Sequence, residues 1–137
     1  MLGEKIGEER GKVTGRRVLE GQDYRYVRME ISFESPGTIL GQAGVNMGTY
    51  TIFERIPGQI YGEGRGIFVT TDGESGIWNG HGIGRMTGDG MGMAFAASVA
   101  FQTNSPKLAR LNDALVLIEH QIDNAGNTHS TLFEWKS

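Results

Sequence analysis

Residues 58–101 read GQIYGEGRGIFVTTDGESGIWNGHGIGRMTGDGMGMAFAASVAF, and this stretch decides the fold. Asp72-Gly73 and Gly88-Asp89-Gly90 divide it into segments in which glycine alternates with apolar and aromatic residues. Asp-Gly between alternating segments is typical of a tight hairpin turn, because such turns need residues with positive φ. We therefore expect three antiparallel strands here, at 60–71, 75–86 and 91–101.

The rest of the chain predicts more of the same architecture. In 24–34, apolar and polar residues alternate, as expected for a strand with one buried face. Ser35-Pro36-Gly37 should end it, and residues 38–43 form either a bulged continuation or a loop. Ser105-Pro106 begins a short helical turn at 106–111. The remaining expected strands are 11–19, 45–56, 112–122 and 128–135. The run 108–118 could instead be a helix, but its β-branched residues favour a strand.

About eight mostly adjacent strands with short turns predict an all-β fold. The expected form is a single antiparallel up-and-down barrel with one short helical turn, covering residues 1–137; a sandwich is the alternative. The helical turn should plug one barrel end, with Lys107 and Arg110 facing solvent.

Composition narrows the classes of function. The chain has 137 residues, no cysteine and a net charge of -3. The missing cysteines exclude disulfides and thiolate chemistry, and the small mixed charge argues against nucleic-acid binding. No run approaches membrane-spanning length, and the first residues lack the apolar core of a signal peptide. We expect a cytoplasmic protein with no nucleic-acid or membrane partner and no cofactor.

Hairpin register selects the candidate site. Two-residue turns at Asp72-Gly73 and Gly88-Asp89 would place one set of residues on the interior face, although an error of one residue would reverse the faces. The candidate ligand-binding residues on that face are Glu63, Arg65, Trp78, Met93, Phe95 and Phe101. Glu63 and Arg65 would form either a salt bridge near the barrel mouth or the polar end of an apolar pocket.

The three histidines give weaker signals. A three-residue loop in the last hairpin pairs Glu119 with Thr131 and puts Glu119 and His129 on one face, with His120 on the other. This pair could do acid–base work, but a solvated polar rim is favoured. His81, between two glycines, is more typical of a surface imidazole than of a ligand contact. No histidine spacing matches a zinc site, so we expect no metal.

The strands expected at 91–101 and 112–122 are apolar on both faces. A barrel wall needs one apolar face, so the other face should meet a covering segment or a second copy of the chain. We expect a homo-oligomer, with the small residues Ala94, Ala96 and Ala100 allowing close approach.

Several segments carry a resemblance to a known family: 62–64, 71–74, 78–85, 102–112 and 134–136, of which Ser-Pro-Lys-Leu-Ala-Arg-Leu-Asn at 105–112 is the most specific. Over nearly its whole length the chain resembles a family of small, uncharacterised prokaryotic proteins. More distantly it is similar to DUF3224-type and allene oxide cyclase-like barrels. The resemblance implies an eight-stranded barrel and often an oligomer, but no reaction and no catalytic residues.

Three functions fit these features. The first is a barrel that binds a small apolar or amphipathic molecule, lined by Trp78, Met93, Phe95 and Phe101 and oriented by Glu63 and Arg65. The second is an isomerase or cyclase with Glu63 or Glu119 as the acid–base group. The third is a structural oligomer with a filled barrel. Cavity volume separates them, since a pocket below about 300 Å³ does not suit a typical ligand site.

Overall fold

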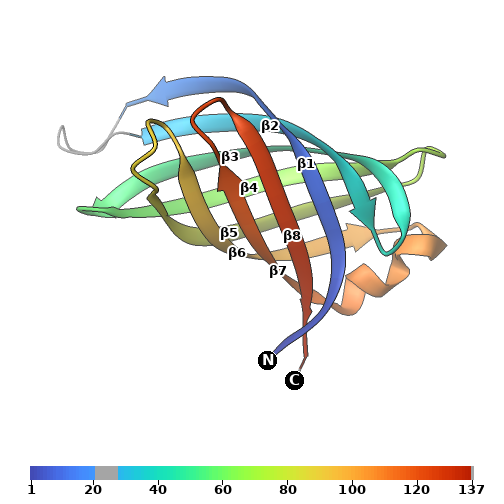
Figure 1. Cartoon of the computed structure of the whole chain (residues 1–137). Coiled ribbons are helices and arrows are strands. Elements are labelled where there is room, and N and C mark those ends of the chain that lie inside the picture. Colours follow the sequence, from blue (N-terminus) through green and yellow to red (C-terminus); the bar gives the residue numbers. More distant parts are fainter. Residues whose placement is uncertain (21–27, 137) are drawn as a thin grey trace.

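The computed structural model describes residues 1–20 and 28–136, which form a closed antiparallel barrel in chain order (Figure 1). Each strand pairs with the next, and the last returns to the first. The strands are β1 (Leu2–Leu19), β2 (Arg28–Ile39), β3 (Gln42–Ile56), β4 (Gln59–Thr70), β5 (Ser75–Met86), β6 (Met93–Thr103), β7 (Leu115–Ile122) and β8 (Asn127–Trp135). One 3₁₀ helix, η1 (Pro106–Asp113), lies between β6 and β7 in the described part of the chain. The predicted eight-stranded barrel is confirmed.

The first half of the barrel corrects two predicted boundaries. Ser35-Pro36-Gly37 does not end β2; Pro36 is exposed and pairs with Val45, and the strand continues to Ile39. The chain then turns at Leu40 and Gly41, whose φ angles are +51° and +76°. Two consecutive positive φ values are the mark of a primed hairpin turn, here without the usual Asn-Gly or Asp-Gly signal. Residues 24–27 of the predicted second strand lie outside the described residues.

The β4–β5 hairpin has a different register from the predicted one. The loop contains three residues, since the Thr70 amide donates to the Glu74 carbonyl at 2.8 Å and the Gly73 amide donates to the Thr70 carbonyl at 3.0 Å. Glu63 therefore pairs with His81 and Gly66 with Trp78, one residue away from the prediction. Because side chains alternate between faces, this single step turns Glu63 and Arg65 outward.

In the β5–β6 and β7–β8 hairpins, the side chains lie on the predicted faces of the sheet. Trp78 pairs with Phe101 and Gly84 with Phe95, so the large residues of β5 and β6 share the inner face as predicted. Their loop is longer than expected, but it shifts the register by an even number of residues. In the last hairpin Glu119 pairs with Thr131, as predicted.

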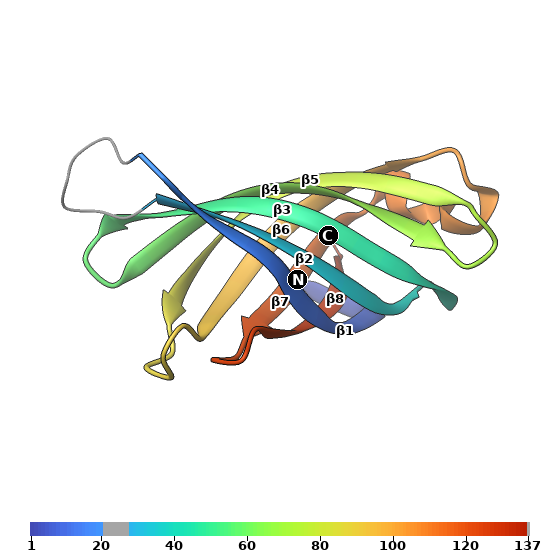
Figure 2. The same ribbon diagram turned by 90° about the horizontal axis from the view of Figure 1, so that it is seen from above.

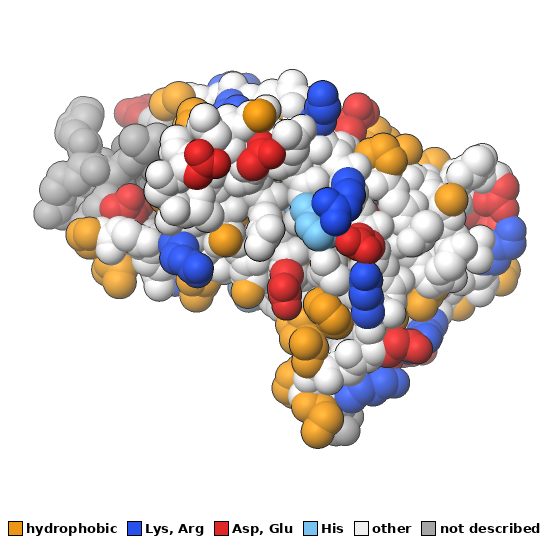
Figure 3. Space-filling model, in the orientation of Figure 1, with side chains coloured by type: hydrophobic (Ala, Val, Ile, Leu, Met, Phe, Trp, Pro, Cys, Tyr) orange, Lys and Arg blue, Asp and Glu red, His pale blue; other side chains and the backbone are white. Residues whose placement is uncertain are grey.

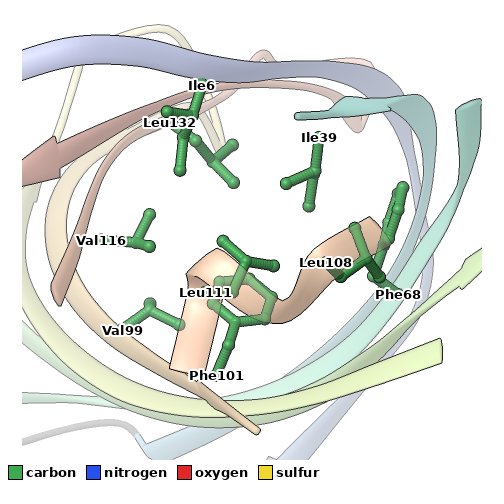
Figure 4. Packing of buried hydrophobic residues seen from close by; sticks show 9 residues of the cluster. All are labelled: Ile6, Ile39, Phe68, Val99, Phe101, Leu108, Leu111, Val116 and Leu132. Atoms are coloured by element: carbon green, nitrogen blue, oxygen red, sulfur yellow. The ribbon is translucent and has the colours of Figure 1, made fainter. Parts of the chain in front are cut away.

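One end of the barrel is closed by η1. Leu108 and Leu111 are fully buried while Lys107 and Arg110 are exposed, which confirms the predicted plug. Figure 4 shows the two leucines pointing into a ring of apolar side chains from the barrel wall. The cluster contains Ile6, Ile39, Phe68, Val99, Phe101, Leu108, Leu111, Val116 and Leu132. Among the described residues, no helix combines the length and apolarity needed to cross a bilayer.

Polar bonds fasten η1 to the strands around it. The Asn112 side chain accepts from the Thr103 amide at 2.8 Å and donates to the Thr103 carbonyl at 3.0 Å, so it extends the ladder of β6. The Arg110 guanidinium donates to both carboxylate oxygens of Glu134 on β8, at 3.1 and 2.8 Å. Figure 2, seen from above, places η1 at the opposite end of the molecule from the β3–β4 turn.

The other end contains a second apolar cluster. Its buried members come from strands β2, β3, β4, β6 and β7: Ile31, Ile52, Ile60, Met93 and Ile122. Between the two clusters lies a layer of buried polar side chains, which include Glu9, Asn46, His120 and Ser130. A polar layer enclosed by two apolar layers is costly unless its groups are paired or used, and it marks the candidate site.

Candidate functional site

A cavity of about 80 Å³ lies inside the barrel at the level of the polar layer. Its inward-facing side chains are Glu9, Phe33, Asn46, Tyr50, Trp78, Phe95, Ala97, Val99, Ile118, His120 and Ser130. Between β4 and β5 the cavity extends to the backbone of the barrel wall, at Gly62, Gly64, Gly80 and Gly82. Glu63 and His81 lie at its border. Larger hollows also indent the outer surface, including one near the β3–β4 turn. We place the candidate site in the interior, because buried polar groups converge there.

The first polar group in the cavity is a carboxyl. Glu9 is only 2% exposed, and its Oε1 accepts from Asn46 Nδ2 at 3.1 Å. Asn46 Oδ1 in turn accepts from Trp78 Nε1 at 2.7 Å, so the asparagine is held from both sides. The second oxygen, Glu9 Oε2, has no hydrogen-bond partner among the described residues. Burial raises the pKa of the Glu9 carboxyl to about 7, although the bond from Asn46 opposes the shift.

The second polar group is a chain of three side chains. His120 Nδ1 lies 2.7 Å from Ser130 Oγ, and His120 Nε2 lies 3.2 Å from the Tyr50 hydroxyl. Burial lowers the pKa of His120 to about 4, so the imidazole is neutral at neutral pH. Burial also raises the pKa of Tyr50, which keeps the phenol protonated. These three side chains therefore give the cavity polar groups that carry no charge at neutral pH.

Glycines make room for the aromatic rings of the cavity. A Cβ at Gly66 would stand 2.4 Å from the Trp78 ring, and one at Gly48 would stand 2.6 Å from it. A Cβ at Gly84 would stand 2.6 Å from the Phe95 ring. The rings thus lie directly against backbone, which only glycine permits at these positions.

The predicted site residues divide into three groups. Trp78 and Phe95 line the cavity. Phe101 belongs to the cluster at η1 and Met93 to the cluster at the other end, so they pack above and below the cavity layer. Glu63 and Arg65 are exposed on the outer face, which corrects the predicted interior position of both.

The acid–base pair considered for the last hairpin also has a different environment. Glu119 and His129 do share the outer face, as predicted, but His129 Nε2 lies 2.7 Å from Glu8 Oε2 on β1. Glu119 is exposed. His129 is therefore within hydrogen-bond distance of a carboxylate on the barrel surface, and His120 is the histidine that faces the interior.

Sequence reasoning missed the main polar residues of the site, namely Glu9, Asn46, Tyr50, His120 and Ser130. Alternation carried a usable signal for one of them, since His120 was placed opposite His129. Glu9 had none, because Glu8 and Glu9 are adjacent acids in a stretch without clean alternation. Only closure of β1 against β8 decides which of the two faces inward.

Comparisons with known proteins give the fold. No family model and no curated protein matches the chain. A protein of unknown function from Clostridium acetobutylicum ATCC 824 has a TM-score of 0.81 at 15% identity, with 97% of this chain and 98% of that chain covered. A conserved protein of unknown function from Rhodopseudomonas palustris has a TM-score of 0.80 at 17% identity, covering 98% and 97%. A β-barrel-like protein from Acinetobacter baumannii AYE has a TM-score of 0.81 at 14% identity, covering 99% and 96%.

These similarities define the class of protein by its fold, an eight-stranded barrel, and two of the three similar structures are described as proteins of unknown function. At such low identity they show the fold alone and assign no activity. The more distant resemblance to DUF3224-type and allene oxide cyclase-like barrels is not confirmed by them.

Proposed function

We propose that this barrel is a binding module that holds a small amphipathic molecule in its interior cavity. The observation that carries the proposal is the composition of the lining: aromatic rings surround a few convergent polar groups. Apolar walls with a small number of placed polar groups are typical of small-molecule sites. In its ionised form the buried Glu9 carboxyl has an oxygen, Oε2, that receives no hydrogen bond from the described residues and could accept one from a guest.

The volume limits the size of the guest. The cavity, about 80 Å³, is far below the roughly 300 Å³ of a typical ligand site, so the volume criterion counts against a drug-sized guest and favours a nearly filled barrel. An engineered cavity of about 150 Å³ takes benzene, so about three or four non-hydrogen atoms fit here. We therefore restrict the proposed guest to a molecule of that size, or to the polar head of a longer one.

An isomerase or cyclase is the alternative function, because the interior carboxyl could act as an acid–base group. Glu63 and Glu119 are exposed on the outer face and do not suit it. An acid–base role would fall to Glu9, whose pKa of about 7 matches a group that exchanges protons at neutral pH. Binding is the simpler proposal, because every described group of the site can contact a bound molecule and none needs a chemical reaction to explain its presence.

The experiment uses the Trp78 indole as the reporter. Its N–H bonds to Asn46 in the cavity, and Trp135→Phe identifies its resonance in a nitrogen–proton NMR spectrum, because the chain has two tryptophans. Titration with small amphipathic compounds should give saturable shifts of the Trp78 resonance.

Gly62→Ala and Gly76→Ala form the matched pair of variants. A Cβ at Gly62 projects into the cavity lining at ordinary distances, 3.5 Å from Ile52 and 3.7 Å from Phe95. A Cβ at Gly76 meets Thr103 at 3.4 Å and lies outside the cavity lining. Gly62→Ala should weaken binding at least fivefold and Gly76→Ala should not. If no compound gives a saturable shift, the filled-barrel function replaces the proposed one.

A further inference from the structure

We propose that the guest of the cavity is a small organic ammonium ion, held between the Glu9 carboxylate and the aromatic rings. This proposal rests on the proposed binding function and names the chemical class of the ligand. It is carried by three features of the described lining: one acidic group with an oxygen that has no partner among the described residues, a set of four aromatic rings, and no lysine or arginine.

The charge of the lining has one sign. Glu9 is the carboxyl that points inward, and its Oε2 is the atom without a partner among the described residues. No lysine or arginine occurs among the described lining residues, and His120 is neutral for the reason given above. An anionic guest would meet an acidic group with no compensating cation, whereas a cation would pair with it.

The rings favour the same class of guest. Phe33, Tyr50, Trp78 and Phe95 all line the cavity. They are in mutual contact, with centroids 5.9 Å apart for Phe33 and Tyr50, 6.4 Å for Phe33 and Trp78, and 6.0 Å for Tyr50 and Phe95. Aromatic rings around a buried carboxylate attract organic ammonium groups through the negative faces of the rings. A metal ion fits less well, because calcium and magnesium need several oxygen ligands and no described group of three His, Cys, Asp or Glu side chains could hold one.

Three probes of four non-hydrogen atoms each test the class: trimethylammonium, 2-propanol and acetate. They have similar branched shapes and differ in charge. We expect trimethylammonium to shift the Trp78 indole resonance with an affinity at least tenfold higher than that of 2-propanol, and acetate to bind no better than 2-propanol. Equal affinity for trimethylammonium and 2-propanol would overturn the ammonium proposal and leave the binding function intact. No saturable shift with any probe would overturn both.

Glu9→Gln is the matched variant, since it keeps the shape and the bond from Asn46 but removes the charge. Trimethylammonium should bind it at least tenfold more weakly, while 2-propanol should change little. Glu63→Gln is the control, because Glu63 borders the cavity from the exposed outer face. Unchanged affinity for trimethylammonium in a folded Glu9→Gln protein contradicts the proposal.

A measurement on the unmutated chain does not depend on the folding of a variant. Trimethylammonium stays charged between pH 5.5 and 8.5, so its affinity should rise at least tenfold over this range as Glu9 ionises. Asn46, Tyr50 and His120 line the cavity with Glu9, and neither titratable group of this set changes charge in the range. Arg16, whose charge acts on Tyr50, stays protonated throughout. His81 and Glu63 border the cavity from outside, so the profile is repeated in His81→Gln. A flat or falling profile in both proteins contradicts the proposal.

Discussion

Asn46 Nδ2 donates to Glu9 Oε1 at 3.1 Å inside the barrel, and Asn46 receives at the same time the indole N–H of Trp78. Because an amide both donates and accepts, this one side chain connects the buried carboxyl to an aromatic ring. The arrangement fixes Glu9 in place, while Oε2 has no hydrogen-bond partner in the described part of the chain. A carboxyl held so rigidly in an apolar barrel has consequences for stability as well as for binding.

Glu9 should make the protein less stable as the pH rises. Its pKa is about 7 in the folded chain, against an ordinary value near 4.5, so the folded state binds the proton more tightly than the unfolded state. The stability contributed by protonated Glu9 is complete below about pH 4.5 and is lost as the pH rises through 7. The shift corresponds to about 3 kcal/mol at pH 8.

Urea denaturation at pH 4.5 and pH 8 measures this effect. We expect the difference in unfolding free energy between wild type and Glu9→Gln to change by about 2–3 kcal/mol in favour of the variant at the higher pH. The comparison across pH cancels the constant cost of burying the glutamine amide. Glu63→Gln, at an exposed position, should show no such change, and a pH-independent difference for Glu9→Gln would contradict the raised pKa.

Gly66→Ala should disturb the site through Trp78. The added methyl group would lie 2.4 Å from the Trp78 ring and 2.5 Å from the Met47 carbonyl oxygen, so both the ring and the backbone of β3 must move. Overpacking of this kind costs about 1–3 kcal/mol, and displacement of the ring should break its bond to Asn46. Thermal unfolding gives the cost and the Trp78 indole resonance reports the lost bond. Gly76→Ala has room for its methyl group, and equal behaviour of the two variants would argue against a tightly held ring.

The hydrogen bonds between Arg110 and Glu134 should stabilise the packing of η1 at neutral pH, and acid should remove this stabilisation. The Arg110 hydrogen bonds and those of Lys136 lower the pKa of Glu134 to about 2. A lowered carboxyl pKa contributes stability above the ordinary value near 4.5 and loses it as the pH falls through about 2. Arg110→Met should therefore lower the melting temperature at pH 7 by about 3–5 °C, and by less at pH 2.5.

Calorimetry at the two pH values measures the Arg110 effect. Arg65→Met removes an exposed arginine from the outer wall and serves as the control. An Arg110→Met protein as stable as wild type at pH 7 would mean that the buried leucines alone hold η1 in place.

The sequence predicted the barrel because turn signals and alternation are local. Asp72-Gly73 marked a turn correctly, but Asp-Gly occurs in loops of two and of three residues. The Thr70 hydroxyl, which accepts from the Glu74 amide at 2.9 Å, helps to close the longer loop. That one-residue difference moved Glu63 and Arg65 from the interior to the surface.

The interior polar groups were harder to predict because they come from distant strands. Glu9 and Asn46 are 37 residues apart, and Tyr50 and His120 are 70 residues apart. Each residue also breaks the rule that inward positions are apolar. Their meeting depends on closure of the barrel and on the β1 register, which shifts near Lys5 and again near Gly15. Pattern reasoning on single strands contains no such information.

We propose, last, that the outer face of β5–β8 meets a second copy of the chain. Large apolar side chains remain exposed there: Ile77, Ile83, Leu115 and Trp135, next to Leu2 of β1. Figure 3 shows hydrophobic side chains gathered at the end of the molecule where the termini lie, whereas charges of both signs cover the wall above. A groove across this face contains small residues of β6, Ala96 and Ser98, which permit close approach of a partner.

Ile83→Glu and Ile56→Glu test this face as a pair. Ile83 is 50% exposed in the groove, and Ile56 is 58% exposed at the β3–β4 turn, so the two changes add the same charge at similar exposure. A dimer joined through β5–β8 should dissociate with Ile83→Glu, because a carboxylate would be buried against its own symmetry mate, and should persist with Ile56→Glu. Sedimentation at micromolar concentration measures the masses. A monomeric wild-type chain, or a dimer that survives Ile83→Glu and not Ile56→Glu, would show that this apolar face does not mediate self-association.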